Sequence, residues 1–317
     1  MRILSGSSFT HVSGQMPAFL TLFEGGTLFL GHNSSPAEFL TTVERERISS
    51  TFLTPALLYE VIDHPQTAAT DTSSLRYLNV GGAAASPARL AEAIDCFGPV
   101  VRLVYGSSEV PLITDLPFLD HDPDHPERLR SCGRPFADAR IEIRDDEGRQ
   151  LPVTQTGQVW VTGSLLMADY WMQPDLTVAA MDGGWLRTGD VGYTDADGYL
   201  YLVDRVSDMI VTSTAAANVY ARPIEDVIAS HPQVRAAAVI GVPDADCGEA
   251  VHAFVVTVPG ADVSADELRA LVREQLNSLY TPRGIDFVGQ LPLTPLAKFD
   301  KKLLRERAEA GRPGSVG

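Results

Sequence analysis

The stretch that decides the fold is GGWLRTGDVGYTDADGYLYLVDR, residues 183–205. Apolar and polar residues alternate on both sides of Asp197-Gly198, which predicts two antiparallel strands joined by a tight hairpin. A plain hairpin does not explain why the carboxylate of Asp190 follows a glycine inside the first strand, or why Arg205 closes the second. The stretch therefore predicts a fold element and raises a question about function.

The composition restricts the class of protein. A chain of 317 residues exceeds the usual size of one domain and predicts two. The formal net charge of −16 argues against nucleic-acid binding, because a phosphate backbone needs a basic footprint. No apolar run approaches the roughly 20 residues that span a bilayer, and the N-terminal stretch lacks the apolar core of a secretory signal. Three cysteines without metal-type spacing fit free thiols, so we expect a cytoplasmic protein with no membrane span.

The first part of the chain alternates predicted strands and helices. TLFEGGTLFLG, residues 21–31, predicts two short strands. Helical spacing occurs in PAEFLTTVERERI, residues 36–48, and in SPARLAEAIDCFG, residues 86–98, where Ser86 is the expected N-cap. VVRLVYG, residues 100–106, predicts another strand. Such alternation predicts an α/β sheet with helices on its faces.

The middle part has a different pattern. RIEIRDDEGRQLPV, residues 140–153, and QVWVTG, residues 158–163, alternate apolar and polar side chains with period two. Together with the hairpin at Asp197-Gly198 they predict an antiparallel β region beside the α/β sheet.

The part after Arg205 predicts a compact α+β domain. PIEDVIASHP, residues 223–232, reads as a short helix. SADELRALVREQLNSL, residues 264–279, reads as a longer one, with Ser264 and Glu267 forming a capping box. Two apolar strands separate these helices, and the C-terminal AGRPGSVG is expected to be disordered.

The loop VYGSSEV, residues 104–110, follows a predicted strand and combines glycine, hydroxyls and a carboxylate. At the carboxyl end of a strand such a loop faces the ligand crevice of an α/β sheet. Its N–H groups and the hydroxyls of Ser107 and Ser108 can hold phosphate oxygens, and Glu109 can bind Mg²⁺. An ordinary polar turn explains the same residues.

Three further loops also have two explanations each. GGAAASP, residues 81–87, allows close approach of a substrate or simply makes a tight turn. HDPDH, residues 121–125, offers metal ligands, but its composition favours a surface loop. PLTPLAKFDKK, residues 292–302, places Lys298 before a basic helix, where a solvated lysine is the ordinary outcome.

Four motifs in order, VYGSSEV, GGWLRTGDVGYTDADGYLYLVDR, NVYARPIEDVI and PLTPLAKFDKK, resemble those of the AMP-forming adenylating enzymes. This superfamily comprises acyl-CoA synthetases, luciferases and nonribosomal-peptide adenylation domains. The resemblance covers nearly the whole chain from THVSG, residues 10–14, onward. It implies the C-terminal portion of a large adenylating domain over residues 1–204. A small mobile α+β domain would follow over residues 205–317, with a hinge near Ser207.

The resemblance implies ATP or AMP as the nucleotide ligand. Asp190 matches the carboxylate that accepts both ribose hydroxyls, and Arg205 matches an arginine that also meets the ribose. The remaining nucleotide and acyl-pocket contacts would come from Gly81, Gly82, Ala83, Tyr105, Gly106, Ser107 and Ser108.

The resemblance also implies three catalytic residues. Glu109 matches the Mg²⁺ ligand, and His11 matches a pocket histidine near the acyl carboxylate. Lys298 matches a mobile lysine that bridges the carboxylate and the α-phosphate, where negative charge gathers in the transition state.

Some family features are absent from the sequence. A Ser/Thr/Gly-rich phosphate loop usually precedes the pocket histidine, and no equivalent occurs here, so we expect a chain that lacks the N-terminal part. The turn VTSTAAANVY, residues 211–220, lacks the usual glycines, which puts CoA use in question. Ala297 replaces the usual glycine before the lysine.

The implied function is activation of a small-molecule carboxylic acid with ATP and Mg²⁺. The acyl group would pass to CoA or to the pantetheine of a carrier protein. Two alternatives remain open: a degenerate homologue that acts as a binding protein, and one half of a split enzyme whose N-terminal half is a separate polypeptide.

Overall fold

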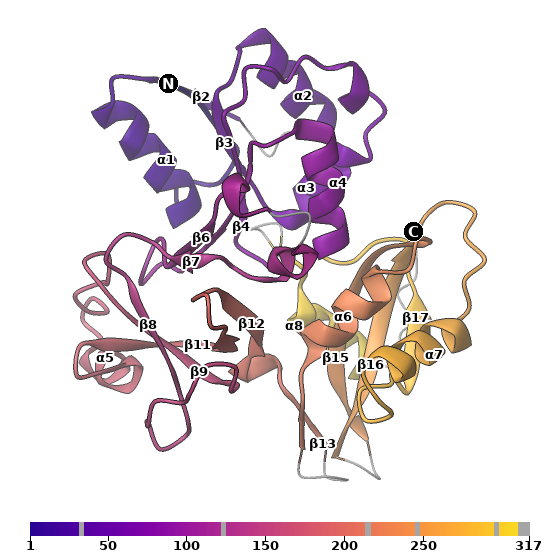
Figure 1. Cartoon of the computed structure of the whole chain (residues 1–317). Helices are drawn as coiled ribbons and strands as arrows, with labels where there is room; N and C mark the ends of the chain where they lie inside the picture. The colour runs from indigo at the N-terminus through magenta and orange to yellow at the C-terminus, as the bar shows by residue number, and fades with distance from the viewer. Residues whose placement is uncertain (32–34, 122–124, 213–216, 245–247, 295–297, 310–317) are drawn as a thin grey trace. The chain divides into compact units, whose positions relative to one another are not determined.

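The computed structural model describes residues 1–31, 35–121, 125–212, 217–244, 248–294 and 298–309 (Figure 1). Its internal contacts divide the chain into two compact units, Met1–Leu202 with Leu296–Lys298, and Val203–Pro295 with Phe299–Gly317. Among the described residues, no helix is long and apolar enough to cross a membrane. Cys96 and Cys132 form no disulfide within the described part of the chain, and Cys247 lies outside it.

The first unit contains a seven-stranded sheet in the order β2-β1-β3-β4-β5-β6-β7. The first five strands in this order are parallel and the last two pairings are antiparallel. The strands are β1 (Arg2–Ser5), β2 (Thr27–Leu30), β3 (Ser50–Leu53), β4 (Tyr77–Gly81), β5 (Val101–Tyr105), β6 (Thr114–Leu116) and β7 (Arg134–Pro135). The predicted α/β sheet is thus confirmed.

Three helices share one core with this sheet: α2 (Pro36–Arg45), α3 (Pro55–Ile62) and α4 (Pro87–Phe97). Each begins with proline, which is preorganised for the first turn and lacks an N–H that would need a partner. Figure 1 shows these helices on one side of the sheet and α1 (Val12–Phe23) on the other. Ser86 occupies the predicted N-cap position of α4, but its side chain makes no capping hydrogen bond.

The prediction of two strands in residues 21–31 was wrong for the first of them. Thr21 to Phe23 form the last turn of α1, and only Thr27–Leu30 is a strand. Gly14 and Pro17 hide the helical pattern in the sequence, and the hydroxyl of Thr21 donates to the carbonyl of Pro17, one turn back in the same helix, at 2.6 Å. The apolar end of α1 is exposed, with Phe23 86% accessible.

An antiparallel sheet completes the first unit, as the sequence predicts. It consists of β8 (Arg140–Arg144), β9 (Gly157–Thr162), β10 (Met181–Asp182), β11 (Trp185–Thr194) and β12 (Leu200–Arg205), with α5 (Pro174–Ala180) leading into β10. The predicted hairpin joins β11 to β12, and Gly198 has φ of +83° in its turn, a conformation that favours glycine. The end of β12 belongs to the second unit.

The second unit is an α+β domain built on one sheet. Its strands are β13 (Ile210–Thr212), β14 (Ala217–Val219), β15 (Val234–Asp244), β16 (Gly248–Thr257) and β17 (Gly284–Phe287), and its helices are α6 (Ala221–Ala229), α7 (Ala265–Gln275) and α8 (Lys301–Glu309). Ala237 and Val239 of β15 pack with α6 and α7. Ala238 and Ile240 pack instead with Leu304 of α8. Because strand side chains alternate, β15 contributes to a core on each face.

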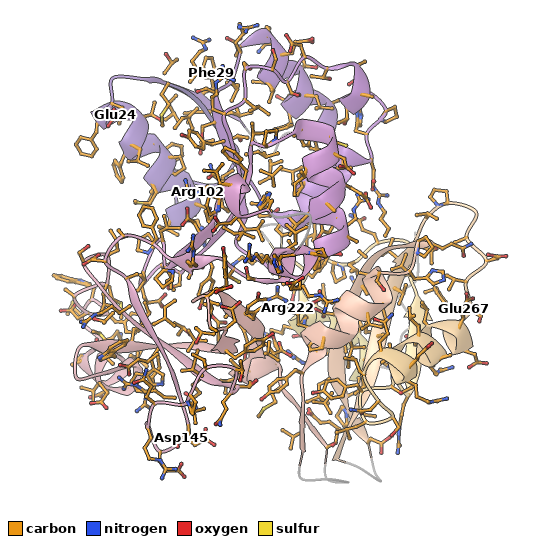
Figure 2. The ribbon with its side chains drawn as sticks, viewed as in Figure 1. Glu24, Phe29, Arg102, Asp145, Arg222 and Glu267 are labelled. Atoms are coloured by element: carbon orange, nitrogen blue, oxygen red, sulfur yellow. The ribbon has the colours of Figure 1, made fainter. Side chains whose placement is uncertain are left out.

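Helix α7 is shorter than the sequence predicts. It ends at Gln275, because the side chain of Asn277 accepts the N–H of Leu279 at 2.8 Å and turns the chain. The predicted capping box is half formed. Ser264 accepts the N–H of Glu267, but the carboxylate of Glu267 (Figure 2) meets His231 at 3.3 Å.

Candidate functional site

Asp190 lies in a β-bulge of the first unit. Arg187 pairs with Trp160 and Val191 with Gln158, so Thr188, Gly189 and Asp190 oppose a single residue of β9. Gly189 allows the bulge with φ of +76°. The hydroxyl of Thr188 accepts the N–H of Asp190 at 3.1 Å, which fixes the turn. The glycine before Asp190 therefore serves to redirect a carboxylate that is only 6% exposed.

The side chain of Tyr105 meets this carboxylate. Its hydroxyl donates to Oδ2 of Asp190 at 2.5 Å. Burial raises the pKa of Tyr105 well above its usual value, and the neighbouring charge of Asp190 raises it further. Tyr105 is the last residue of β5, so the contact joins the carboxyl edge of the parallel sheet to the antiparallel sheet.

The glycines of the 81–87 loop begin at the same edge. Gly81 pairs with Val104, the residue before Tyr105. A Cβ at Gly81 would lie 2.4 Å from the carbonyl oxygen of Val104, so no larger residue fits. Gly82 has φ of +81°, and Gly82 and Ala83 are exposed at the end of β4. The two loops that the sequence singled out are thus neighbours in the structure.

Residues 106–110 form a tight turn after β5. A Cβ at Gly106 would lie 2.3 Å from the carbonyl oxygen of Pro111. The N–H of Ser107 donates to the carbonyl of Val110 at 2.9 Å, and its hydroxyl accepts the N–H of Val110 at 3.3 Å. Ser107 therefore stabilises the turn, whereas Ser108 is exposed.

Glu109 is held by a segment that the sequence analysis missed. The hydroxyl of Tyr170 donates to Oε1 of Glu109 at 2.8 Å, and the N–H of Met167 donates to its carbonyl at 2.8 Å. Burial and the bond to Glu109 together raise the pKa of Tyr170 to about 12. Nothing local in the sequence marks Tyr170, since its partner lies 61 residues away.

His11 is the N-cap of α1. Its Nδ1 lies 2.8 Å from the hydroxyl of Ser13 and accepts the N–H of the same residue at 3.2 Å. Burial lowers the pKa of His11, and the charge of Lys298 lowers it further. Lys298 groups with the first unit, and its Cε would lie 3.7 Å from a Cβ at Gly82. His11, Gly82 and Lys298 are thereby brought together.

A cavity of about 410 Å³ opens beside the carboxyl ends of β1 and β2. Its lining residues are Ser5, Gly6, Ser7, Ser8, Phe9, Leu30 and Gly31. The hydroxyl of Ser5 is buried and makes no hydrogen bond within the described part of the protein. Ligands of α/β sheets bind at this end of the strands.

The other predicted positions lie in the second unit or outside the described residues. Arg205 and Ser207 belong to the second unit, where both side chains are exposed. Ala297, residues 213–216 of the turn and residues 122–124 of HDPDH lie outside the described residues. In the described ranges, no three His, Cys, Asp or Glu side chains gather as a metal cluster.

Two family models match the chain. They are "AMP-binding enzyme" over residues 1–171 and "AMP-binding enzyme C-terminal domain" over residues 223–298. A medium/long-chain-fatty-acid–CoA ligase of Mycobacterium tuberculosis is 42% identical over 305 residues, which is 94% of this chain and 52% of that protein. A fatty acid–[acyl-carrier-protein] ligase of Streptomyces coeruleorubidus is 34% identical and matches 90% of this chain and 55% of its own length. The chain thus spans about half the length of these curated relatives.

Solved structures agree with these matches. The amide bond synthetase McbA from Marinactinospora thermotolerans superposes with a TM-score of 0.91 and 44% identity, covering 96% of this chain and 62% of that one. The o-succinylbenzoate CoA synthetase of Bacillus subtilis, solved with AMP, gives a TM-score of 0.81 and 28% identity, covering 99% of this chain and 62% of that one.

Proposed function

This chain belongs to the AMP-binding enzyme family, and from that premise we propose that it takes part in ATP-dependent activation of a carboxylic acid. A carboxylate oxygen attacks the α-phosphorus of ATP, the bond to the bridging oxygen breaks, and pyrophosphate leaves with the electron pair. A thiolate then attacks the acyl carbonyl carbon, and AMP leaves.

The observation that carries the proposal is the hydrogen bond between Tyr105 and Asp190 at the carboxyl edge of the sheet. There a buried carboxylate, an aromatic ring and the glycine loop at Gly81 lie together. Each carboxylate oxygen has two lone pairs, so Oδ2 can accept both Tyr105 and a ribose hydroxyl. In this proposal Asp190 binds the ribose and Tyr105 and Gly82 line the adenine.

Glu109 is the proposed Mg²⁺ ligand. Magnesium in nucleotide sites is commonly bound by one or two carboxylates together with substrate phosphates, so a single half-buried carboxylate fits. Tyr170 fixes the orientation of that carboxylate. The bound cation would neutralise phosphate charge, and Ser108 at the exposed tip of the turn is the proposed phosphate contact.

Lys298 and His11 are the proposed residues for the acid. A lysine suits the place where charge from the carboxylate and the α-phosphate gathers in the transition state. The proximity of Lys298 to His11 and Gly82 supports this assignment. Arg205 is proposed as a further ribose contact, made when a hinge near Ser207 turns the second unit.

A fatty acid is the first acid class to test, since two relatives are fatty-acid ligases by name. The proposed acceptor is the thiol of CoA or of a carrier protein. The similarity to an amide bond synthetase, at 44% identity, makes an amine the second candidate acceptor. The protein is incubated with an acyl-adenylate and, in separate reactions, with CoA, with a carrier protein or with a primary amine. The acylated product that forms identifies the acceptor among these three.

The nucleotide assignment is tested by calorimetry with AMP. Asp190→Asn should weaken binding by about 2–3 kcal/mol, because hydrogen bonds to a charged acceptor are lost. Asp195→Asn is the matched control, since Asp195 lies in the same hairpin and its Oδ1 accepts N–H groups of its own turn. Equal AMP affinity in wild type and Asp190→Asn would contradict the assignment.

A further inference from the structure

An ion pair between Lys301 and Glu225 lies at the edge of the sheet in the second unit. The Nζ of Lys301, in the first turn of α8, lies 2.8 Å from Oε1 of Glu225 on α6. The two side chains are only 18% and 16% exposed. The same Oε1 accepts the N–H of Val239 at 2.7 Å. β15 ends the path of the sheet, so this bond satisfies an N–H on its outer edge.

This pair joins helices from opposite faces. α6 packs against one side of β15 and α8 against the other (Figure 1). Burial lowers the pKa of Lys301, but the charges of Glu225 and Asp204 outweigh it and raise the pKa above its usual value. The lysine is thus held charged between carboxylates from two other elements.

Asp204 connects the pair to the segment 204–208, near the start of the second unit. One oxygen accepts the N–H of Arg205 at 2.8 Å, and the other accepts the N–H of Ala221, the first residue of α6, at 2.5 Å. One turn beyond Lys301 on α8, Arg305 donates to Asp208 at 2.8 Å. Both ends of the segment 204–208 are therefore tied to helices of the second unit.

The same helix begins directly after a pairing of residues 292–293 with residues 299–300, which we call the base of the Lys298 loop. The N–H of Asp300 donates to the carbonyl of Pro292 at 2.8 Å, and Leu293 bridges to Phe299. The carboxylate of Asp300 accepts the N–H of Leu303 at 2.9 Å. The loop base is thereby continuous with the start of α8, where Lys301 is anchored.

We propose that Lys301 is a positioning residue, which holds the base of the Lys298 loop and the segment carrying Arg205 on one body. Its relevance to catalysis rests on the function proposed above for Lys298 and Arg205. Buried ion pairs contribute little net stability, since desolvation opposes their attraction, so a role in geometry accounts better for this one. A catalytic group that is misplaced by 1 Å can lose about 100-fold in rate.

Hydrogen exchange of the 317-residue chain tests the positioning directly. Lys301→Met should raise the exchange rates of the Ala221, Asp300 and Leu303 amides at least tenfold, because the bonds that protect them depend on the anchored helix. Protection of the β15–β16 amides should persist. Lys302→Met is the matched control, since Lys302 is the next residue of the helix and 87% exposed, and it should change none of them. Unchanged exchange at the three amides in Lys301→Met would overturn the proposal.

A second variant, Glu225→Gln, and a measurement of acyl-adenylate formation complete the test. Glu225→Gln keeps the shape of the side chain and removes its charge, so it should raise the exchange rates of the same three amides. This variant keeps the test decisive if Lys301→Met folds poorly. In acyl-adenylate formation, Lys301→Met should lower turnover at least tenfold, and Lys301→Arg should restore most of it. Unchanged turnover in Lys301→Met would overturn the catalytic part. If the wild-type protein forms no acyl-adenylate, the proposed function is contradicted. The hydrogen-exchange rates would still decide whether Lys301 positions the base of the loop.

Discussion

The hydroxyl of Tyr105 and the carboxylate of Asp190 are joined by a 2.5 Å hydrogen bond between residues 85 positions apart. Because a carboxylate accepts this bond inside the protein, Tyr105→Phe should lower the free energy of unfolding by about 1.5–3 kcal/mol. Urea unfolding measures this, and AMP affinity should fall as well. Tyr199→Phe is the control, since the Tyr199 hydroxyl donates to Asp120 at 3.1 Å. Loss of AMP affinity in both variants alike would count against a specific role for Tyr105.

His11 combines a helix cap with the proposed contact to the acid, and two substitutions separate these roles. His11→Ala removes the cap and should cost about 1 kcal/mol of unfolding free energy. His11→Asn keeps a capping acceptor and should be near wild type in stability. If His11 also serves the acid, both variants slow acyl-adenylate formation. A normal rate in His11→Asn would leave only the capping role.

Gly189→Ala tests whether the bulge directs the carboxylate. At φ of +76° an alanine should cost about 1–2 kcal/mol of stability. Gly148, with φ of +80° and open space around it, should show the same stability cost. Only Gly189→Ala should weaken AMP binding in calorimetry. Equal AMP affinities for the two variants would show that the bulge is not part of the nucleotide site.

The stability of the protein at alkaline pH should report the half-buried Tyr170. Burial and the bond to Glu109 raise the pKa of Tyr170 to about 12, whereas an unfolded tyrosine titrates near about 10. A raised pKa in the folded state contributes stability that is complete below pH 10 and is lost as pH rises toward 12. Tyr170→Phe should therefore show a shallower decline of unfolding free energy over this window. Parallel declines in the two proteins would refute the contribution of Tyr170.

The sequence predicted the elements whose patterns are local. Period-two alternation located the antiparallel strands, and apolar residues three and four apart located α2, α4 and α7. The error at Thr21–Phe23 arose because Gly14 and Pro17 interrupt a helix that the rest of the fold supports. The end of α7 was missed because it depends on the side chain of Asn277, whose oxygen accepts the N–H groups of Leu279 and Tyr280.

The site was predictable by residue but not by geometry. Asp190 and Tyr105 could be singled out from their motifs, and their roles toward a ligand stay predictions. That they contact each other depends on pairing between distant strands, for which the sequence has no local sign. The same holds for Tyr170 and Glu109, which lie on separate elements.

β15 belongs to two cores at once, and this limits how its sequence can evolve. Insertion or deletion of one residue in the middle of the strand would exchange the faces of the side chains beyond it. Ala238 and Ile240 would then face α6 and α7, and Ala237 and Val239 would face α8. We expect lineages of this domain to vary β15 by substitutions of similar volume and to accumulate length changes in the loops that flank it.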